Sequence, residues 1–440
     1  MKATFRKGGV HPPQNKTAST RIELQPLPLV AVLPLSQHIG APAQPLVNKG
    51  DTVVRGMKVA ECAGNVSAAV HSPITGTVAS IDNVVMPNGR PAKALIIKAT
   101  EAEHEADCSA RNEYMHLLDS ASAHNEALNA LSPEEMRRKV ADCGIVGLGG
   151  ATFPTPIKLI TSSSKPDTLI INACECEPYL MCDDALMRRY SRQAAEGVEL
   201  IKRIIGAKKA IIGIEDNKPE AIAAMRNAVV GLDAIEVVEL QTKYPQGGEK
   251  QLIEAVTGRR VPSGALPSSI GVVVNNIATA FAVWQAIVLD MPLIERIITV
   301  TGDIPESERL NYMVAVGTPF ADLPFTLPEN AKAIIGGTMM GRTAVRLDAP
   351  VTKGTSGLVL LKAQAAKPVL ACVRCGACVD ACPMGLEPYL LSTFGRLRRW
   401  DDARANDVAD CLECGACSYS CPSNRPLLDY IRIAKKRSHN

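Results

Sequence analysis

Near its C-terminus the chain carries the same cysteine run twice, as Cys372-x-x-Cys375-x-x-Cys378-x-x-x-Cys382-Pro383 and as Cys411-x-x-Cys414-x-x-Cys417-x-x-x-Cys421-Pro422. Cysteines at this spacing match the ligands of a module that holds two [4Fe–4S] clusters. In such modules the first three cysteines of a run bind one cluster, and the fourth binds the other. The predicted ligand sets are Cys372, Cys375, Cys378 and Cys421 for cluster 1, and Cys382, Cys411, Cys414 and Cys417 for cluster 2.

Structural zinc and a disulfide framework are the alternatives for these cysteines. Zinc sites pair cysteines two and two and rarely use a third C-x₂ step. Disulfide frameworks are typical of small secreted domains, whereas this chain has 440 residues and begins MKATFRKGG, without the apolar segment of a signal peptide. The spacing therefore favours iron–sulfur clusters, which carry single electrons.

The composition indicates a globular protein with several domains. Hydrophobic residues make up 46% of the chain and charged residues 21%, which is ordinary for globular proteins. A net charge of +3 and only 4% aromatic residues argue against nucleic-acid binding. The 14 cysteines indicate a reducing compartment. We expect no membrane span, because the longest apolar candidate, residues 270–289, is interrupted by Asn275, Asn276, Thr279 and Gln285.

The first predicted domain, residues 1–125, is mostly β. Residues 33–97 read as short strands separated by Gly, Pro and Asn. Within them, 47–53 and 72–78 resemble the barrel-sandwich of biotinyl and lipoyl carrier domains. Residues 61–70 contain no lysine that could be modified, so we expect a scaffold or docking module. The polar stretch 101–131 is predicted to be a helix or a linker.

The second predicted domain, residues 126–294, alternates strands and helices. Ser132 and Pro133 are expected to start a helix as its N-cap and first residue. Such alternation predicts a mainly parallel, Rossmann-like α/β sheet. Its predicted strands are 168–171, 209–214 and 272–274, and its predicted helices are 185–205 and 219–230.

Two smaller domains are predicted to follow. Residues 295–361 return to short β segments and resemble the soluble-ligand-binding β-grasp domain. Residues 362–440 form the α-helical ferredoxin module, with a helix over 386–400. Three arginines of that helix are either a solvated face or a docking patch for an acidic redox partner: Arg396, Arg398 and Arg399.

The first of three loops suited to a nucleotide spans residues 147–158 of the α/β domain. Its glycines let backbone N–H groups approach a phosphate or a flat ring, and Thr155 as N-cap with Pro156 is expected to open a helix. The loop does not fit G-x-G-x-x-G. A tight turn explains the glycines equally well.

The other two loops follow predicted strands, where ligands of open α/β sheets bind. Residues 172–179 contain Glu175 and Glu177, which could bind ribose hydroxyls or form a solvated acidic turn. Residues 275–279 form a strand-to-helix junction suited to phosphate. We expect three nearby cysteines to be ordinary thiols, because the sequence offers no fourth metal ligand: Cys174, Cys176 and Cys182.

Together these loops resemble the FMN- and NADH-binding subunit of respiratory complex I. That family has a Gly-rich loop ending in Phe-Pro-Thr, an Asn-x-x-Glu-x-Glu-Pro loop and an Asn-Asn-x-x-Thr motif in this order. The resemblance implies that Glu175 and Glu177 face the ribose and nicotinamide of NADH. It departs at Cys174, where Asp is usual, and at Gly248, where an acid is usual. The residues implied to surround FMN are Gly147, Gly149, Gly150, Lys158, Asn172, Glu175, Tyr244, Gly247, Asn275, Asn276 and Thr279.

A narrower resemblance covers essentially the whole chain. The stretches 7–13 (KGGVHPP), 174–179 (CECEPY) and 243–247 (KYPQG), with the doubled cysteine run, are similar to the C subunit of the Rnf (Rsx) ion-translocating electron-transport complexes. That family implies an NADH-oxidising translocase subunit that passes electrons through FMN and two clusters to an iron–sulfur partner subunit. The membrane subunits would couple this flow to Na⁺ or H⁺ transport toward ferredoxin. The chain would be peripheral, on the cytoplasmic face of the inner membrane.

Two other functions fit parts of the sequence. A soluble flavin-dependent reductase, like the cobalamin reductase relatives, would use the same cofactors, but those proteins tend to start with the flavin domain. A non-catalytic ferredoxin-like adaptor would use only the clusters, and flavin content separates it from both enzymes. No general acid or nucleophile is required for NADH oxidation at a flavin, so we predict no catalytic side chain beyond the cofactor ligands.

Overall fold

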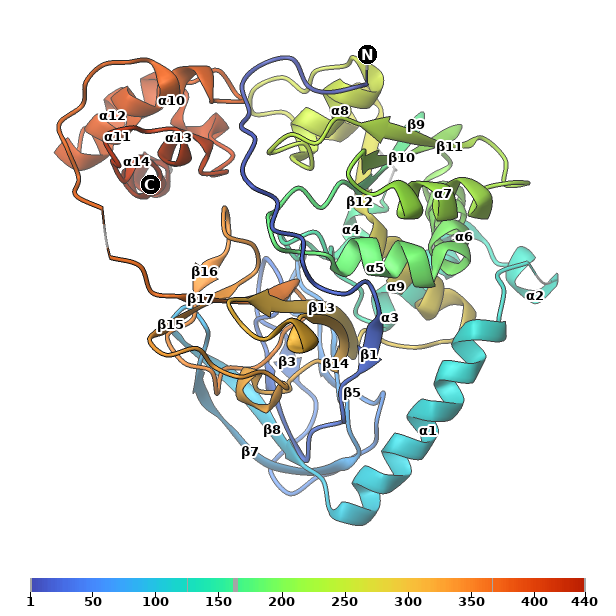
Figure 1. The fold of residues 1–440 in the computed structure, drawn as a ribbon. Helices are drawn as coiled ribbons and strands as arrows, with labels where there is room; N and C mark the ends of the chain where they lie inside the picture. The colour runs from blue at the N-terminus through green and yellow to red at the C-terminus, as the bar shows by residue number, and fades with distance from the viewer. Residues whose placement is uncertain (1, 125, 161–164, 366, 439–440) are drawn as a thin grey trace.

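Four β-sheets and a separate helical lobe make up the described part of the computed structural model of the chain (Figure 1). The structure describes residues 2–124, 126–160, 165–365 and 367–438. The predicted domain limit at residue 125 lies outside these residues, and the division at 295 and 362 stays a prediction.

Two antiparallel sheets form the N-terminal β domain, and the predicted barrel-sandwich is confirmed. Ala31, Leu33, Leu95 and Ile97 alternate along two paired strands and are buried in its core. One sheet has the order β2 (Val30–Pro34), β8 (Pro91–Lys98), β7 (Gly76–Val85) and β4 (Thr52–Val53). The other has the order β3 (Gln44–Pro45), β5 (Lys58–Glu61) and β6 (Val70–His71).

A long helix, α1 (Glu101–Ser120), leads from this domain to the next, so most of the polar stretch is helix rather than linker. Thr100 and Glu103 form a reciprocal capping box at its start. Figure 1 shows α1 along the edge of the molecule between the barrel and α2 (Glu126–Asn129).

The α/β domain has a wholly parallel sheet, as predicted. The strand order is β11 (Ile235–Leu240), β10 (Lys209–Glu215), β9 (Thr168–Ala173) and β12 (Val272–Asn276). Helices cover both faces, which explains the apolar strands. They are α3 (Pro133–Asp142), α5 (Cys182–Arg189), α6 (Ser191–Ile205), α7 (Pro219–Ala228), α8 (Glu249–Thr257) and α9 (Ile277–Val288).

Local helix signals in this domain were partly right. Ser132 is the N-cap of α3, as expected. The single helix predicted over 185–205 is wrong, because the chain breaks at Tyr190 (φ −123°, ψ 36°) between α5 and α6. Thr155 is not an N-cap: Pro154 holds that place, and Thr155 is the first residue of the short helix α4 (Thr155–Lys158).

A mixed six-stranded sheet follows the α/β domain. Its edge strand β1 (Ile22–Leu24) comes from the N-terminal region and pairs in parallel with β14, although the sequence pattern grouped residues 1–29 with the barrel. The strand order is β1, β14 (Leu310–Ala315), β13 (Glu295–Gly302), β17 (Gly357–Lys362), β15 (Ala331–Ile335) and β16 (Arg342–Thr343).

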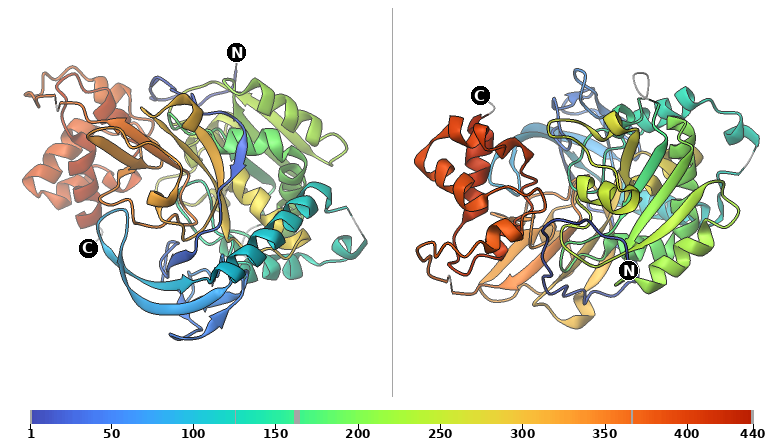
Figure 2. Two further views of the ribbon diagram at one scale, coloured as in Figure 1. Left: turned by 60° about the horizontal axis from the view of Figure 1, so that its bottom comes forward. Right: turned by 90° about the horizontal axis from the view of Figure 1, so that it is seen from above.

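The cysteine runs fold as a separate lobe, shown in red in Figures 1 and 2. The helix predicted over 386–400 is present but shorter, because Arg398 adopts a left-handed conformation that ends it, and the next helix starts at Trp400. The lobe contains α10 (Ala377–Asp380), α11 (Pro388–Leu397), α12 (Trp400–Ala405), α13 (Ala416–Tyr419) and α14 (Leu427–Ser438). Short 3₁₀ helices along the chain are Pro267–Ile270, Glu306–Glu308, Phe320–Asp322 and Val408–Asp410.

Candidate cofactor sites

The three predicted nucleotide loops meet at the carboxyl edge of the parallel sheet. Asn276 at the end of β12 is in register with Asn172 on β9, and its Nδ2 donates to the Asn172 carbonyl at 3.3 Å. A Cβ atom on Gly149 would lie 3.2 Å from the Asn276 side chain, so the glycine loop approaches the same point. The structure therefore brings the third loop, about a hundred residues further along the chain, beside the first two, where open α/β sheets bind ligands.

Hydrogen bonds fix the glycine loop on the start of α9. Asn276 is the N-cap of α9, and its Oδ1 accepts from the N–H groups of Ala278 and Thr279. The Thr279 Oγ1 accepts from the Leu148 N–H at 2.9 Å. Thr279, which is fully buried, therefore holds the loop in place, and its expected role in the FMN site stays a prediction.

Lys158 projects toward the same edge. Its Nζ donates to the Val274 carbonyl at 2.9 Å and to Glu249 Oε1 at 3.0 Å. Both side chains of this ion pair are partly exposed, so the ammonium can also meet an anionic ligand from solvent. Glu249 is the first residue of α8, next to Gly248, where the acid usual in the complex I family is missing.

The residues at this edge fit a flavin nucleotide. Gly150 has φ +108° and nothing within 4 Å of where a Cβ would lie, so its backbone is open to a close-lying ligand. Asn275 Nδ2 and Thr155 Oγ1 are buried and have no hydrogen-bond partner among the residues that the structure describes, and buried polar atoms normally have one. Gly247 leaves room beside Asn172, whose Nδ2 donates to the Gly247 carbonyl at 2.8 Å.

The two carboxylates of the second loop are not a solvated turn. Glu175 accepts from the N–H groups of Asp183 and Asp184, at 2.9 and 3.2 Å, and so caps α5. Glu177 accepts from the N–H groups of Met339 and Met340, at 2.9 and 2.8 Å. Each carboxylate keeps unused lone pairs, and the expected roles of both toward NADH stay predictions.

Burial governs the titration of the groups under this loop. It raises the pKa of Asp183 to about 7, helped by the charge of Glu175 and opposed by the hydrogen bond from Asn276. Burial also raises the pKa values of Cys174, Cys176 and Cys182, which favours the neutral thiol. Burial likewise raises the pKa of Glu177, while its two backbone hydrogen bonds lower it.

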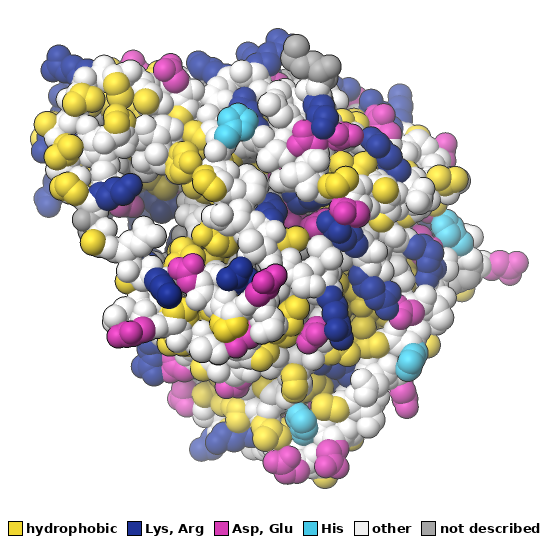
Figure 3. All heavy atoms as spheres, viewed as in Figure 1, with side chains coloured by type: hydrophobic (Ala, Val, Ile, Leu, Met, Phe, Trp, Pro, Cys, Tyr) yellow, Lys and Arg dark blue, Asp and Glu magenta, His cyan; other side chains and the backbone are white. Residues whose placement is uncertain are grey.

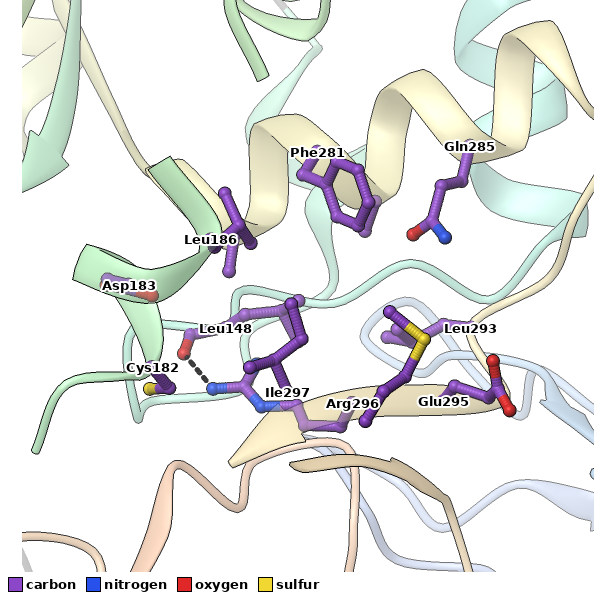
Figure 4. Close-up of a pocket in the computed structure, with 13 residues that line it drawn as sticks. Leu148, Cys182, Asp183, Leu186, Phe281, Gln285, Leu293, Glu295, Arg296 and Ile297 are labelled. Carbon is purple, nitrogen blue, oxygen red and sulfur yellow. Dashed lines mark hydrogen bonds between the residues drawn. The ribbon is translucent and has the colours of Figure 1, made fainter. Parts of the chain in front are cut away.

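A cavity lies behind the glycine loop, between α5, α9 and β13 (Figure 4). The buried guanidinium of Arg296 donates to the Leu148 carbonyl at 2.8 Å and supports the loop from this side. The cavity leaves about 30 Å³ for the centres of water-sized molecules, enough for a few waters but not for a flavin. The nucleotide edge is therefore the open side of the loop.

Cluster 2 has a preformed cavity. Its four predicted ligands line one apolar space together with leucines and Ile431 of the lobe. Burial and the charges of the neighbouring thiols raise the pKa of Cys414 to about 11 and of Cys417 to about 12. Four thiols converging on an apolar cavity fit a [4Fe–4S] cluster, whose irons would stabilise the thiolates.

The cysteines of cluster 1 lie nearer the surface. Cys372 and Cys375 are exposed, and Cys378 and Cys421 are half-buried. The charges of Cys421 and Cys372 contribute, after burial, to the raised pKa of Cys378, so the fourth cysteine of the second run lies beside the first run. Figure 3 shows hydrophobic side chains on the visible surface of this lobe, and exposed residues include Val369, Leu370 and Val373.

Tyr244 joins the nucleotide edge to cluster 2. It is 1% exposed, and its hydroxyl donates to the Cys414 carbonyl at 2.7 Å. The resemblance placed Tyr244 beside FMN but gave no hint of its contact with the cluster loop. Sequence reasoning also missed Met339, which packs in the same junction and whose N–H binds Glu177.

Comparison with known proteins identifies similar regions along the chain. Residues 3–102 match the RnfC barrel sandwich hybrid domain, residues 140–285 the Nuo51 FMN-binding domain, and residues 371–425 a 4Fe-4S dicluster domain. In the solved NAD⁺-reducing [NiFe]-hydrogenase in the H₂-reduced state, one chain is similar in fold, with a TM-score of 0.51 and 21% identity over 73% of this chain and 66% of that one.

Curated relatives match nearly the full length. The C subunit of the Na⁺-translocating ferredoxin:NAD⁺ oxidoreductase complex of Acetobacterium woodii is 39% identical, covering 98% of this chain and 96% of that protein. The C subunit of the proton-translocating ferredoxin:NAD⁺ oxidoreductase complex of Clostridium ljungdahlii is 40% identical, covering 99% and 94%. The C subunit of the ion-translocating oxidoreductase complex of Haemophilus influenzae is 39% identical over 98% of this chain, which spans 64% of that longer protein.

Proposed function

The chain belongs to the family of C subunits of ion-translocating, Rnf-type oxidoreductase complexes, and we propose that it exchanges electrons between NADH and an iron–sulfur partner subunit. It carries an FMN-binding domain and a 4Fe-4S dicluster domain. When bound, FMN converts the electron pair of a hydride into single electrons, and each cluster carries one of these.

One observation carries the proposal: the nucleotide edge and cluster 2 share a junction. Tyr244 contacts the Cys414 loop through its hydroxyl, and Gly247, three residues later, lies against Asn172. The Tyr244 side chain and the short loop that follows it therefore connect the nucleotide edge, where we propose that NADH is oxidised, to the loop that carries the cluster 2 ligand Cys414. This order makes cluster 2 the inner cluster, and exposed cluster 1 the outer one.

In this proposal the chain's own residues bind and orient the cofactors. The glycine loop, Lys158 and the Asn275–Thr279 junction hold the phosphate end of FMN, and Asn172 with Gly247 borders its ring. Arg296 stiffens the loop from behind. The cysteine sets assigned above bind the two clusters.

We assign binding of NADH hydroxyls to Glu177, with Glu175 holding the α5 start in place beside it. Glu177 reaches its position from the loop 174–179 and is oriented by the backbone of Met339 and Met340. The carboxylate is thus fixed between two domains, with lone pairs left for ribose hydroxyls.

We propose a peripheral position on the cytoplasmic face of a membrane complex that moves Na⁺ or H⁺. Among the described residues, none of the helices combines the length and apolar character needed to cross a bilayer. The exposed cluster 1 side of the lobe is the proposed contact with the next electron carrier, and the arginines of 396–399 and the barrel-sandwich domain are the proposed docking surfaces.

The proposal is tested by NADH oxidation with ferricyanide as acceptor in purified Glu177→Gln protein. The substitution removes the charge and keeps one oxygen acceptor, so one of the two backbone N–H groups, of Met339 or of Met340, loses its partner. KM for NADH should rise about tenfold or more, the effect of losing a hydrogen bond to a charged group worth ~1.5–3 kcal/mol. Glu236→Ala, on an exposed position of the edge strand β11, is the control. Flavin-loaded protein that oxidises no NADH would refute the function.

A further inference from the structure

A segment that the proposed function leaves unused passes between the α/β domain and the cysteine lobe. Residues 2–17, the N-terminal segment, run from the edge of the parallel sheet to the lobe and back toward β1 (Figures 1 and 2). It contains the KGGVHPP stretch that stood out in the sequence. We propose that Lys7, Gly8, Gly9 and Val10 are positioning residues that seat the Cys382 loop against the cofactor loops and so fix cluster 2 near the nucleotide edge.

Successive residues of the segment bind the two parts of the molecule. Val10 forms a two-way backbone bridge with Tyr244, in which both N···O distances are 2.8 Å. The neighbouring Gly9 donates its N–H to the Ala381 carbonyl at 3.0 Å. One short stretch of backbone is therefore hydrogen-bonded to a cofactor loop and to the residue before the cluster ligand Cys382.

The glycines at this point are required by both conformation and space. Gly8 has φ +68° and Gly9 has φ +91°, values that favour glycine. A Cβ on Gly8 would lie 2.4 Å from the carbonyl carbon and oxygen of Cys382, closer than real Cβ contacts. Because the obstacle is backbone, a side chain on Gly8 must displace the Cys382 loop. A Cβ on Gly385, in the same loop, would lie 2.0 Å from the Lys7 ammonium nitrogen, so the Lys7 side chain occupies the space beside that glycine.

The segment is anchored on both sides of the glycines. Phe5 is 1% exposed, and the Lys243 ammonium lies 4.0 Å from its ring centroid. On the other side, Lys16 donates to the carbonyls of Glu175, Glu177 and Leu180, at 2.9, 3.0 and 2.6 Å. The partners of Phe5 and Lys16 lie in or next to the loops of the nucleotide edge. The segment is therefore fixed to these loops on both sides of the glycines that contact the lobe.

Among the described residues, the α/β domain also reaches the Cys382 loop of the lobe directly through buried Gln251, whose Nε2 donates to the Pro383 carbonyl at 3.5 Å and lies 3.4 Å from Met384 Sδ. The covalent link of the lobe, residues 363–371, is exposed throughout its described part. An ion pair joins Lys250 and Asp410 at 3.5 Å, with both side chains only partly buried. The packed part of the junction is a small apolar cluster that includes Val10, Tyr244, Ala381, Cys414 and Ala416. Val10 belongs to this cluster, and the rest of it comes from the two parts being joined.

The test compares Gly8→Ala with Gly206→Ala in the full, cluster-loaded chain. Gly206 also has φ +68° but nothing within 4 Å of its Cβ position, so its substitution imposes the same backbone strain without the clash. The first readout is hydrogen exchange under anaerobic conditions. The amides of Gly9 and Val10 should exchange faster in Gly8→Ala, because the clash pushes the N-terminal segment and the Cys382 loop apart and disturbs both backbone bonds, and should be unchanged in Gly206→Ala.

The second readout rests on the proposed function. Iron content and NADH oxidation with ferricyanide should be unchanged in Gly8→Ala. Electron exchange between the nicotinamide cofactor and the clusters should be slower than in Gly206→Ala, because displacing the Cys382 loop moves cluster 2 away from the nucleotide edge. Wild-type protein that does not oxidise NADH would refute the proposed function. The hydrogen-exchange rates of the Gly9 and Val10 amides would still decide whether the segment docks the lobe.

The proposal would be overturned if Gly8→Ala protein showed the same hydrogen-exchange rates at Gly9 and Val10, and the same rate of cluster reduction, as wild-type protein. If Gly8→Ala fails to retain iron, Val10→Ala replaces it, because that substitution removes apolar contact from the junction without adding an atom. The same loss of protection is expected over residues 7–10 and 381–385. Unchanged protection in Val10→Ala would equally contradict a docking role.

Discussion

At the scale of single residues, cysteine substitutions separate the two clusters. Cys375→Ser removes a ligand of exposed cluster 1 and leaves the cavity of cluster 2 intact. Wild-type protein should hold about eight irons per chain, and the variant should lose the EPR signal of one cluster while largely retaining the other. Cys62→Ser is the matched control, since Cys62 is exposed but lies outside both runs. Stoichiometric zinc without acid-labile sulfide would contradict the assignment.

Asp183 should make stability depend on pH. Its pKa is raised to about 7 in the folded chain, so between about pH 4 and 7 the folded state holds a proton that the unfolded chain releases. The contribution of Asp183 to the free energy of unfolding therefore falls as pH rises through that window. Asp183→Asn should melt near the wild-type temperature at pH 4 and increasingly above it toward pH 7, in flavin-free protein. A melting-temperature difference that does not change with pH would show that Asp183 titrates normally.

Motifs predicted residue types well but did not predict their partners. The cysteine spacing identified the thiols that converge in the lobe, and strand ends identified the polar loops that meet at the sheet edge. The partners of Glu177 could not be found this way, because Met339 and Met340 lie in another domain and have no distinctive local pattern. The same holds for Tyr244, whose hydroxyl binds a backbone carbonyl, a group that every residue carries.

At the scale of elements, capping predicts a measurable stability. Ser132 and Glu135 form a capping box at the start of α3. Ser132→Ala should lower the free energy of unfolding by about 1 kcal/mol, seen as a lower melting temperature. Ser132→Asp should retain most of the stability, since Asp also caps helices well. Equal melting temperatures for Ser132→Ala and wild-type protein would mean that α3 is held by packing alone.

The missed helix limits have local physical causes. A single helix was expected over 185–205, yet Tyr190 leaves the helical conformation between α5 and α6. Tyr190 stacks on Phe281 of α9, with ring centroids 5.1 Å apart, so tertiary packing accompanies the break. Thr155 looked like an N-cap, but the residue before it, Pro154, already occupies that position.

At the scale of the whole molecule, the arrangement of the domains was not predictable from sequence. Periodicity predicted the parallel sheet, the β regions and the helical lobe, because each pattern is local. The N-terminal segment and β1 leave the barrel and pair with distant parts of the chain. Such pairings depend on contacts separated by hundreds of residues, which one sequence does not reveal. One of them, the bridge between Val10 and Tyr244, lies in the junction between the nucleotide edge and the cysteine lobe.

The central claim is that nicotinamide and clusters exchange electrons within this one chain. We would mix chemically reduced, flavin-loaded protein with NAD⁺, and oxidised protein with NADH, and follow the cluster EPR signals with nicotinamide absorbance under anaerobic conditions. In at least one direction, set by the cluster potentials, the cluster signals should change together with the nicotinamide, two electrons for each NADH. Cluster signals that stay unchanged in both mixtures, in protein with full flavin and iron content, would contradict the account.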